Sequence, residues 1–395
     1  MEGKIAKPEA ILSIPLRQHR RTNNEICVIT AATWSISKFR IDMIDEFVRR
    51  GSEVVVFGDE PHEEWDPYFK KHGVSYRTYP ISRNGMNPVS DLATKAALKK
   101  LLAEEKPDKV WTYQAKPNIY GCMAAHELGI EDVYVMMGGL GSVFRAKDAK
   151  SRVVRAIVSA EYRHAMRNAK VVFFQNMEDV EVFEELRILS REKAVLTRGS
   201  GVNTSEYSLA PLPSRMSFLF VGRLVRGKGV LDYLEASRMV KKVHPEVGFN
   251  LVGPFDTNPT ALKIDDIQPY IDEGTVVFHG KQVYVRPFQE ASSVFVLPSY
   301  YGEGTPKSAL EAMSTGRPLI VADAVGCREV VKDGVNGFLV PPQDPEAIAK
   351  AMMDLIEEPG LKEKMGLESR RMAEEIFDVR KVNEVICDAM GLENA

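Results

Sequence analysis

The sequence predicts an α/β protein made of two Rossmann-like domains that face each other across a cleft. Short apolar runs rich in β-branched and aromatic residues alternate with amphipathic runs of helical period along the chain. A segment dense in glycine and proline interrupts this alternation once, near residue 200, and the pattern then starts again. Alternating strands and helices build parallel sheets from βαβ units, so two such halves predict two domains of one architecture.

The expected elements follow this alternation in chain order. In the first half, strands are expected at residues 25–30, 53–57, 109–113, 132–137 and 171–175, with helices at 36–50, 91–105, 118–128, 150–167 and 178–186. The linker is expected at 198–204 and 210–214. Strands of the second half are expected at 217–221, 249–252, 275–279, 293–297 and 319–322.

These elements divide the chain into an extension, two domains and a final helix. The extension is residues 1–24, and the first domain is residues 25–205. The second domain is residues 206–375, and the final helix lies in residues 376–395. Whether this helix packs on the first domain is left open by the pattern.

The composition excludes several classes of protein. The net charge is −3 over 395 residues, which gives no overall reason to expect a nucleic acid partner. The four scattered cysteines lack metal-ligand spacing and are expected to be reduced residues of a cytosolic protein. No apolar run approaches the roughly 18 residues that cross a bilayer, and residues 1–24 lack the apolar core of a signal peptide.

Residues 298–313 combine an anion site with two carboxylates. Glu303 lies in the loop after an expected strand, and Thr305 is expected to cap a helix that starts at Pro306. The first amides of such a helix point outward unpaired and bind anions. Glu311 lies about 7–8 Å further along the helix axis. A helix start for phosphate, with an acid on either side for hydroxyl groups, fits a nucleotide sugar.

Residues 217–229 supply positive charge at a second strand end. Arg223, a bidentate donor, and Lys228, a point charge, both precede the next helix. The spacing is close to that of a P-loop, but Gly229 stands where that loop requires a Ser or Thr hydroxyl for magnesium. No Asp-x-Asp clamp occurs in the sequence. We therefore expect a diphosphate to be bound by Arg, Lys and helix amides without a metal ion, and we disfavour an NTPase.

These two segments together resemble glycosyltransferase family 4, whose members are retaining enzymes of GT-B fold. The resemblance rests on Val-Gly-Arg-Leu-x-x-x-Lys-Gly at 221–229 and on Glu-Gly-x-Pro-x-x-x-x-Glu-Ala at 303–312, and it covers most of residues 217–345. It implies that Arg223 and Lys228 bind the donor diphosphate and that Glu303 holds hydroxyls of the transferred sugar. These three would be the catalytic residues.

The same resemblance implies further contacts with the donor. Glu311 would hold the nucleotide ribose and Val283 would touch the base, while the start of the helix would meet phosphate or sugar. The full set of implied donor-binding residues is Gly222, Val283, Gly304, Thr305, Pro306, Lys307, Ser308 and Glu311.

The first half is similar to a narrower group within this family. Residues 81–88, 113–121 and 138–144 resemble bacterial transferases that add galactose or N-acetylhexosamine to saccharides linked to undecaprenyl pyrophosphate. The implied acceptor contacts are Arg83, Lys116, Asn118 and Gly139. The chain departs from the family at 30–34, where many members have a Gly-Gly pair, and it lacks the His that many place after a strand of the first domain.

Residues 145–170 form a basic amphipathic segment. Apolar residues are interleaved with eight basic ones, which are Arg145, Lys147, Lys150, Arg152, Arg155, Arg163, Arg167 and Lys170. A basic amphipathic helix is typical of a surface that binds anionic lipid. Together with the lipid-linked acceptor, this segment predicts a cytoplasmic enzyme held peripherally at the cytoplasmic face of the inner membrane.

The resulting hypothesis is a UDP-sugar-dependent retaining transferase that extends a polyprenyl-pyrophosphate-linked saccharide and needs no cofactor or metal. Two alternatives remain open. One is an isomerase of GT-B fold resembling UDP-N-acetylglucosamine 2-epimerase, and the other is a non-catalytic module that binds nucleotide sugars. A dinucleotide dehydrogenase is disfavoured because residues 30–34, after the first strand, contain no glycine.

Overall fold

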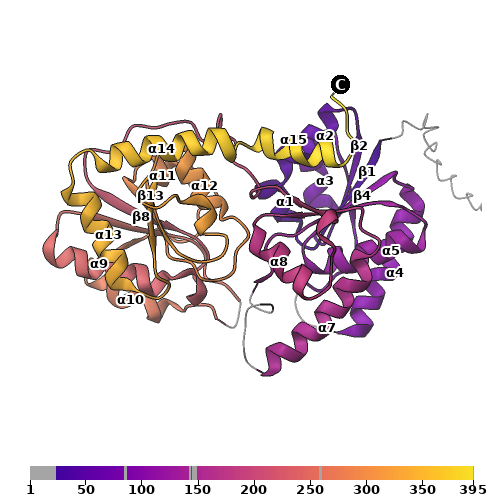
Figure 1. Ribbon diagram of the computed structural model, residues 1–395, viewed down its shortest axis with the longest axis horizontal. Coiled ribbons are helices and arrows are strands. Elements are labelled where there is room, and N and C mark those ends of the chain that lie inside the picture. Colours follow the sequence, from indigo (N-terminus) through magenta and orange to yellow (C-terminus); the bar gives the residue numbers. More distant parts are fainter. Residues whose placement is uncertain (1–23, 84–86, 142–143, 145–148, 258–259, 395) are drawn as a thin grey trace, which may run out of the picture.

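The computed structural model describes residues 24–83, 87–141, 144, 149–257 and 260–394, so the expected extension lies outside the described residues except for Asn24. Two α/β domains lie side by side (Figure 1). Each has a parallel sheet with helices packed against it, as the alternating pattern predicts.

The first domain contains, within the described residues, a parallel sheet of seven strands in the order β3-β2-β1-β4-β5-β6-β7. The strands are β1 (Glu25–Thr30), β2 (Glu53–Gly58), β3 (Ser75–Thr78), β4 (Lys109–Tyr113), β5 (Asp132–Met136), β6 (Val171–Phe174) and β7 (Ala194–Leu196). The helices include α1 (Thr33–Phe39), α2 (Ile41–Arg49), α3 (His62–Lys71), α4 (Pro88–Glu105), α5 (Cys122–Glu127), α7 (Ala149–Met166) and α8 (Met177–Glu185).

The second domain repeats this plan with six described strands in the order β10-β9-β8-β11-β12-β13. The strands are β8 (Ser217–Val221), β9 (Gly248–Val252), β10 (Val277–Phe278), β11 (Val294–Leu297), β12 (Leu319–Ala322) and β13 (Gly337–Val340). The helices include α9 (Val230–Val243), α10 (Ile264–Asp272), α11 (Arg286–Glu290), α12 (Lys307–Ser314), α13 (Pro345–Glu357) and α14 (Leu361–Ile376). All residues of β8 and β11 are buried, which explains their continuous apolar sequence.

Several elements differ from the expected ones. The edge strands β3, β7 and β13 were not predicted, because a strand at a sheet edge needs no long apolar run. In β3 only Tyr76 is buried. Helix α3 was missed and contains Pro67. The expected helix at 36–50 is two helices, α1 and α2, separated by Arg40.

The final helix, α15 (Val379–Ala389), returns to the first domain. It packs against α2, and Ile386 is fully buried in the core cluster that also holds Phe47. Arg50 Nη1 donates to Leu392 O at 2.7 Å. Figure 1 shows α14 over the second domain and α15 over the first, lying end to end.

The two segments that cross between the domains bond to each other. Val202 N donates to Phe377 O at 2.8 Å, and Val379 N donates to Val202 O at 2.9 Å. Gly201 has φ +71°, and a Cβ there would lie 2.6 Å from Val379 Cα. The pairing of the two segments therefore requires glycine at position 201. The pairing holds the two connections between the domains side by side.

Candidate active site

The candidate site lies where the loops after β8 and β11 leave the second sheet. These strands are neighbours in the sheet, with Val294 opposite Phe218. The helix after β8, α9, packs with α10 and α13, whereas the helix after β11, α12, packs with α11 and α14. The two loops therefore diverge toward opposite faces, and such a divergence opens a ligand crevice at the carboxyl ends of the strands.

A buried ion pair joins the two loops. Lys228 Nζ lies 2.6 Å from Glu303 Oε1, and each side chain is only 13% exposed. Ser299 Oγ donates to the same carboxylate oxygen at 2.6 Å. Burial alone raises the pKa of Glu303, but the charge of Lys228 and the hydrogen bonds from Lys228 and Ser299 outweigh burial, so this pKa is lowered. The predicted catalytic residues Lys228 and Glu303 are thus brought together as an ionised pair.

Arg223 lies at the same crevice but is more open to solvent. Its Nη1 lies 2.6 Å from Asp256 Oδ2, and its guanidinium lies 5.5 Å from the centre of the Tyr301 ring. Its charge also contributes to lowering the pKa of Glu303. Asp256 and Tyr301 were not singled out from the sequence, because each is separated from Arg223 by a long stretch of chain, although Tyr301 lies within the segment 298–313. They orient the guanidinium beside the pair.

A glycine allows the two loops to touch. Gly229 has φ +72°, and a Cβ there would lie 2.2 Å from Pro298 O. Helix α9 begins at the next residue, Val230. Lys228 therefore sits on a turn pressed against the end of β11, which explains how its side chain reaches Glu303.

Helix α12 starts later than predicted. Its first residue is Lys307 and its cap is Pro306, with no side-chain capping bond. The predicted cap at Thr305 is therefore wrong. Ser308 Oγ donates to Val221 O at 3.2 Å, and Lys307 Nζ donates to Gly201 O at 2.8 Å. These bonds tie the start of α12 to β8 and to the crossing segment.

Thr305 is engaged by the first domain instead. Its backbone N donates to Gln175 Oε1 at 2.8 Å, and its hydroxyl donates to Gln175 O at 3.4 Å. In this conformation the Thr305 amide is bonded to a protein group, and its contact with the donor stays a prediction. Gln175, at the end of β6, was not among the predicted site residues.

Glu311 lies deeper in α12 and is 9% exposed. Its Oε2 accepts a hydrogen bond of 3.4 Å from Gln289 Nε2. Burial raises the pKa of Glu311, although Lys307 and the hydrogen bonds from Gln289 and Tyr207 act in the opposite direction. Burial also raises the pKa of Tyr207, and the charge of Glu311 adds to that shift.

Val283, the residue expected at the base, is 64% exposed. Its backbone O accepts a hydrogen bond of 3.3 Å from Lys38 Nζ in the first domain. Val283 thus lies where the second domain meets the first, and its contact with the base stays a prediction. Gly222 N donates to Val252 O at 3.0 Å, and this hydrogen bond holds the start of the loop after β8 against the end of β9.

The four expected acceptor residues take different positions in the first domain. Gly139 lies at the domain contact, where a Cβ would be 2.6 Å from Gly304 N. Lys116 Nζ pairs with Asp91 Oδ1 at 2.6 Å. Asn118 is 1% exposed and donates to Met136 O at 2.9 Å, so its side chain braces the end of β5.

Arg83 is exposed, and its guanidinium lies 5.8 Å from the centre of the Trp34 ring. Trp34 is 40% exposed on α1. Of the four residues, Gly139 is packed against Gly304 at the domain contact, Lys116 is paired within its own domain and the Asn118 side chain is enclosed, whereas Arg83 is exposed.

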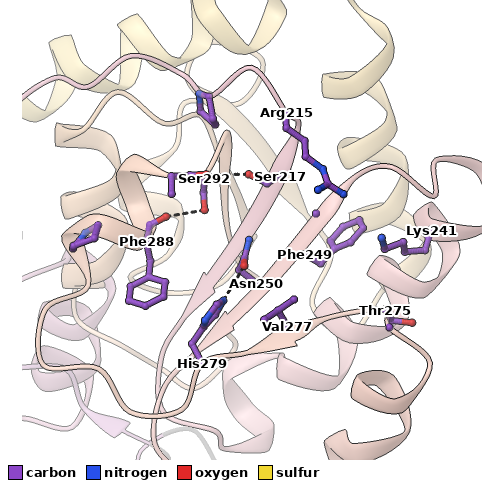
Figure 2. A pocket seen from close by; sticks show the side chains of 15 residues that line it. Arg215, Ser217, Lys241, Phe249, Asn250, Thr275, Val277, His279, Phe288 and Ser292 are labelled. Atoms are coloured by element: carbon purple, nitrogen blue, oxygen red, sulfur yellow. Dashed lines mark hydrogen bonds between the residues drawn. The ribbon is translucent and has the colours of Figure 1, made fainter.

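A separate cavity of about 520 Å³ lies elsewhere in the second domain. Figure 2 shows His279, Asn250 and Phe288 facing it, with Arg215 and Lys241 near its rim. Its lining includes the first residues of β8 and β9. It therefore lies toward the amino ends of these strands, away from the crevice formed by the loops that carry Lys228 and Glu303.

Comparison with known families matches both domains. Residues 215–358 match the family model described as glycosyl transferases group 1, and residues 25–176 match the model described as glycosyl transferase 4-like. The chain belongs to the family 4-like glycosyltransferases. The match confirms the resemblance drawn from the motifs at 221–229 and 303–312.

Two relatives agree with this assignment. One relative is the N,N'-diacetylbacillosaminyl-diphospho-undecaprenol alpha-1,3-N-acetylgalactosaminyltransferase of Campylobacter jejuni, 26% identical over 83% of this chain and 88% of that protein. Another is the UDP-Gal:alpha-D-GlcNAc-diphosphoundecaprenol alpha-1,3-galactosyltransferase of Escherichia coli, 28% identical over 69% of this chain and 73% of that protein.

The fold is shared with solved glycosyltransferases. Anabaena HepE in complex with UDP superposes with a TM-score of 0.74 at 17% identity, over 93% of this chain and 99% of that chain. Sucrose-phosphate synthase from Thermosynechococcus elongatus superposes with a TM-score of 0.74 at 20% identity, over 92% of this chain and 98% of that chain. The glycosyltransferase therefore has the GT-B fold, as the sequence predicted.

The opposite pKa shifts of Glu303 and Glu311 predict that pH changes their contributions to folding stability in opposite directions. For Glu311 the folded pKa is raised above the ordinary 4.5, so ionisation costs stability once the pH rises through the folded pKa. For Glu303 the folded pKa is lowered, so its stabilising contribution is present above 4.5 and is lost as the pH falls through the folded pKa. At pH 8, Glu311→Gln should raise the Tm of the unliganded enzyme and Glu303→Gln should lower it.

Thermal unfolding at pH 8 and at pH 5 measures this difference. The Glu311→Gln shift should shrink at pH 5, because the raised pKa leaves Glu311 largely protonated in the folded protein, where its carboxyl is then as neutral as the amide. The Glu303→Gln shift should persist at pH 5, because this pH lies above 4.5 and the lowered pKa keeps Glu303 ionised. Equal shifts of the same sign for both variants would contradict the assigned environments.

Proposed function

We propose that this glycosyltransferase moves a hexose or N-acetylhexosamine, of the galactose or N-acetylgalactosamine type, from a UDP-sugar to a saccharide linked to polyprenyl pyrophosphate. The anomeric configuration is retained, and the product serves surface polysaccharide or glycan assembly. The observation that carries the proposal is the buried Lys228–Glu303 pair beside Arg223, on the loops at the carboxyl ends of β8 and β11. The relatives named above, which act on undecaprenyl-diphosphate-linked saccharides, support the acceptor class.

Positive charge near the leaving group is the main catalytic device in this proposal. As the bond from sugar to UDP breaks, negative charge develops on the diphosphate, and Arg223 and Lys228 stabilise it from fixed positions. Glu303, held ionised by Lys228, accepts hydrogen bonds from sugar hydroxyls. The acceptor hydroxyl attacks from the face that the diphosphate leaves and gives its proton to the departing diphosphate oxygen. The configuration is thus retained without a carboxylate nucleophile.

Replacing the charged residues should slow transfer by different amounts. Arg223→Ala and Lys228→Ala should each lower kcat by on the order of 10²–10³, as expected for the loss of one preorganised donor to a developing charge. Glu303→Gln should lower it roughly 10- to 100-fold, because charge-assisted hydrogen bonds are worth about 1.5–3 kcal/mol. The measurement is transfer from a panel of UDP-sugars to a lipid-pyrophosphate monosaccharide.

Arg226→Ala is the matched control for this series. Arg226 lies on the same loop, but its guanidinium pairs with Asp266 at 3.2 Å and is 55% exposed. Its loss should leave kcat near that of wild type. Near-normal transfer by both Arg223→Ala and Glu303→Gln would contradict the site. Conversion of the donor alone into a new UDP-sugar would favour the isomerase, and binding without any turnover would favour a non-catalytic module.

The enzyme should work without a divalent metal ion. In the proposal the charges of Arg223 and Lys228 take the place that magnesium has in metal-dependent transferases. Adding EDTA to the transfer assay should therefore leave the rate largely unchanged. Strict dependence on magnesium, restored after chelation by adding the ion back, would contradict the role given to these two residues.

Membrane docking by α7 is the third part of the proposal. Val153 is 62% exposed and Ile157 is 48% exposed, one turn apart on the helix. Figure 1 shows the start of α7 projecting from the first domain. Among the described residues, no helix is long and apolar enough to cross a membrane. The exposed pair would instead enter the lipid interface, at the cytoplasmic face of the inner membrane.

The basic part of this surface is smaller than the sequence suggested. Arg163 donates to Leu186 O at 2.9 Å and Lys170 pairs with Asp132 at 2.6 Å, so both serve the protein itself. Arg152 and Arg167 are exposed. Arg145, Lys147 and the side chain of Lys150 lie outside the described residues. The apolar pair therefore carries more of the proposed docking than the sequence implied.

Substituting the apolar pair tests membrane docking. The double variant Val153→Asp/Ile157→Asp should reduce binding to anionic vesicles by about tenfold or more, because each buried aliphatic side chain is worth about 1.5–3 kcal/mol. Co-sedimentation with phosphatidylglycerol vesicles measures it. Leu367→Asp is the control, since Leu367 is 61% exposed on α14 of the other domain. Equal binding by the double variant and wild type would refute docking through α7.

A further inference from the structure

The contact between the domains touches the segment that carries Glu303. Gln175 follows β6 in the first domain and is 5% exposed, and Thr305 is 7% exposed. Two hydrogen bonds join them, from Thr305 N to Gln175 Oε1 at 2.8 Å and from the Thr305 hydroxyl to Gln175 O at 3.4 Å. The side chain and the backbone of one residue thus hold a residue two positions after Glu303.

Glycines make this contact close. A Cβ on Gly304 would lie 2.2 Å from Gln175 Oε1 and 3.0 Å from Gly138 O. Gly139 has φ +107°, and a Cβ there would lie 2.6 Å from Gly304 N. Backbone therefore packs on backbone across the cleft, which only glycine permits at these positions. Glycine at positions 139 and 304 therefore allows the close contact between the domains.

The segment 303–305 therefore contacts its own domain on one face and the first domain on the other. On one side the Glu303 carboxylate meets Lys228 and Ser299 of its own domain. On the other side, Gly304 and Thr305 meet the first domain. A sugar has no room on this second face, because Gln175 and the backbone at Gly138 already cover it.

We propose that Gln175 is a positioning residue for the transfer reaction. This inference rests on the function proposed above. The Gln175 carboxamide holds the loop, so that the Glu303 carboxylate keeps its position relative to Lys228 and to the transferred sugar. The donor diphosphate binds to the second domain alone, whereas correct placement of Glu303 requires the first domain to be closed on it. Loss of the amide leaves the Thr305 N–H without its acceptor and lets the loop shift, and small displacements of reacting groups lower rates steeply.

The test compares Gln175→Ala with Glu178→Gln, a variant that removes a different contact between the domains. Glu178 pairs with Arg328 across the cleft, and Arg328 also bonds Asp323 Oδ1 at 2.8 Å within its own domain. Gln175→Ala should lower kcat by on the order of 10- to 100-fold and leave UDP affinity, measured by calorimetry, unchanged. Glu178→Gln should change neither quantity, since it weakens the domain contact without touching residues 303–305.

Hydrogen exchange gives a readout that does not depend on turnover. Peptides covering 298–308 should exchange faster in Gln175→Ala than in wild type or Glu178→Gln. Gln175→Glu, which keeps an acceptor oxygen for Thr305 N, should restore slow exchange. Slow exchange in Gln175→Ala, or equal loss of kcat in Gln175→Ala and Glu178→Gln, would overturn the proposal.

The two proposals fail in distinguishable ways. If wild-type enzyme neither binds UDP nor turns over any UDP-sugar, the proposed function fails, while the exchange data still decide whether Gln175 holds the loop. If wild type transfers sugar and Gln175→Ala matches it in kcat, the function stands and the positioning role is refuted.

Discussion

The ion pair between Lys228 and Glu303 is the interaction on which the site depends. Both side chains are largely withdrawn from water, where a single unpaired charge would be strongly destabilising. Pairing keeps the carboxylate ionised and the ammonium in place before any donor arrives. The surrounding features serve this pair: Ser299 donates to the carboxylate, and Gly229 lets the turn that bears Lys228 press against the end of β11.

The contact between the domains connects the segment that carries Glu303 to the first domain. The paired crossings at Val202 and Val379 set the domains beside each other, and α15 closes over the first domain. Gly139 and Gln175 then meet the chain next to Glu303. A reaction between a donor held by one domain and an acceptor held by the other requires such a junction, because the reacting groups belong to different sheets.

The two domains divide the chemistry unequally. In the second domain, Arg223, Lys228 and Glu303 lie on loops that follow buried strands, so their geometry is preorganised. In the first domain, Lys116 and Asn118 are already bonded to protein groups, and the exposed Arg83 stacks near Trp34. This division agrees with a compact nucleotide-sugar donor on one side and a larger acceptor, approached from the surface, on the other.

The sequence by itself determined the fold class and singled out Arg223, Lys228 and Glu303, because strand periodicity and strand-end loops are local properties of the chain. The ion pair between Lys228 and Glu303 was decided by the tertiary structure, which brings the two loops together. The sequence did not reveal Asp256, Tyr301 or Gln175, whose roles arise from residues far apart in sequence. It also misplaced the start of α12. There a hydrogen-bond partner 130 positions away took the Thr305 hydroxyl that local propensity assigned to a cap. Only the folded chain decides between such competing partners, since each polar group bonds whichever neighbour the packing brings near.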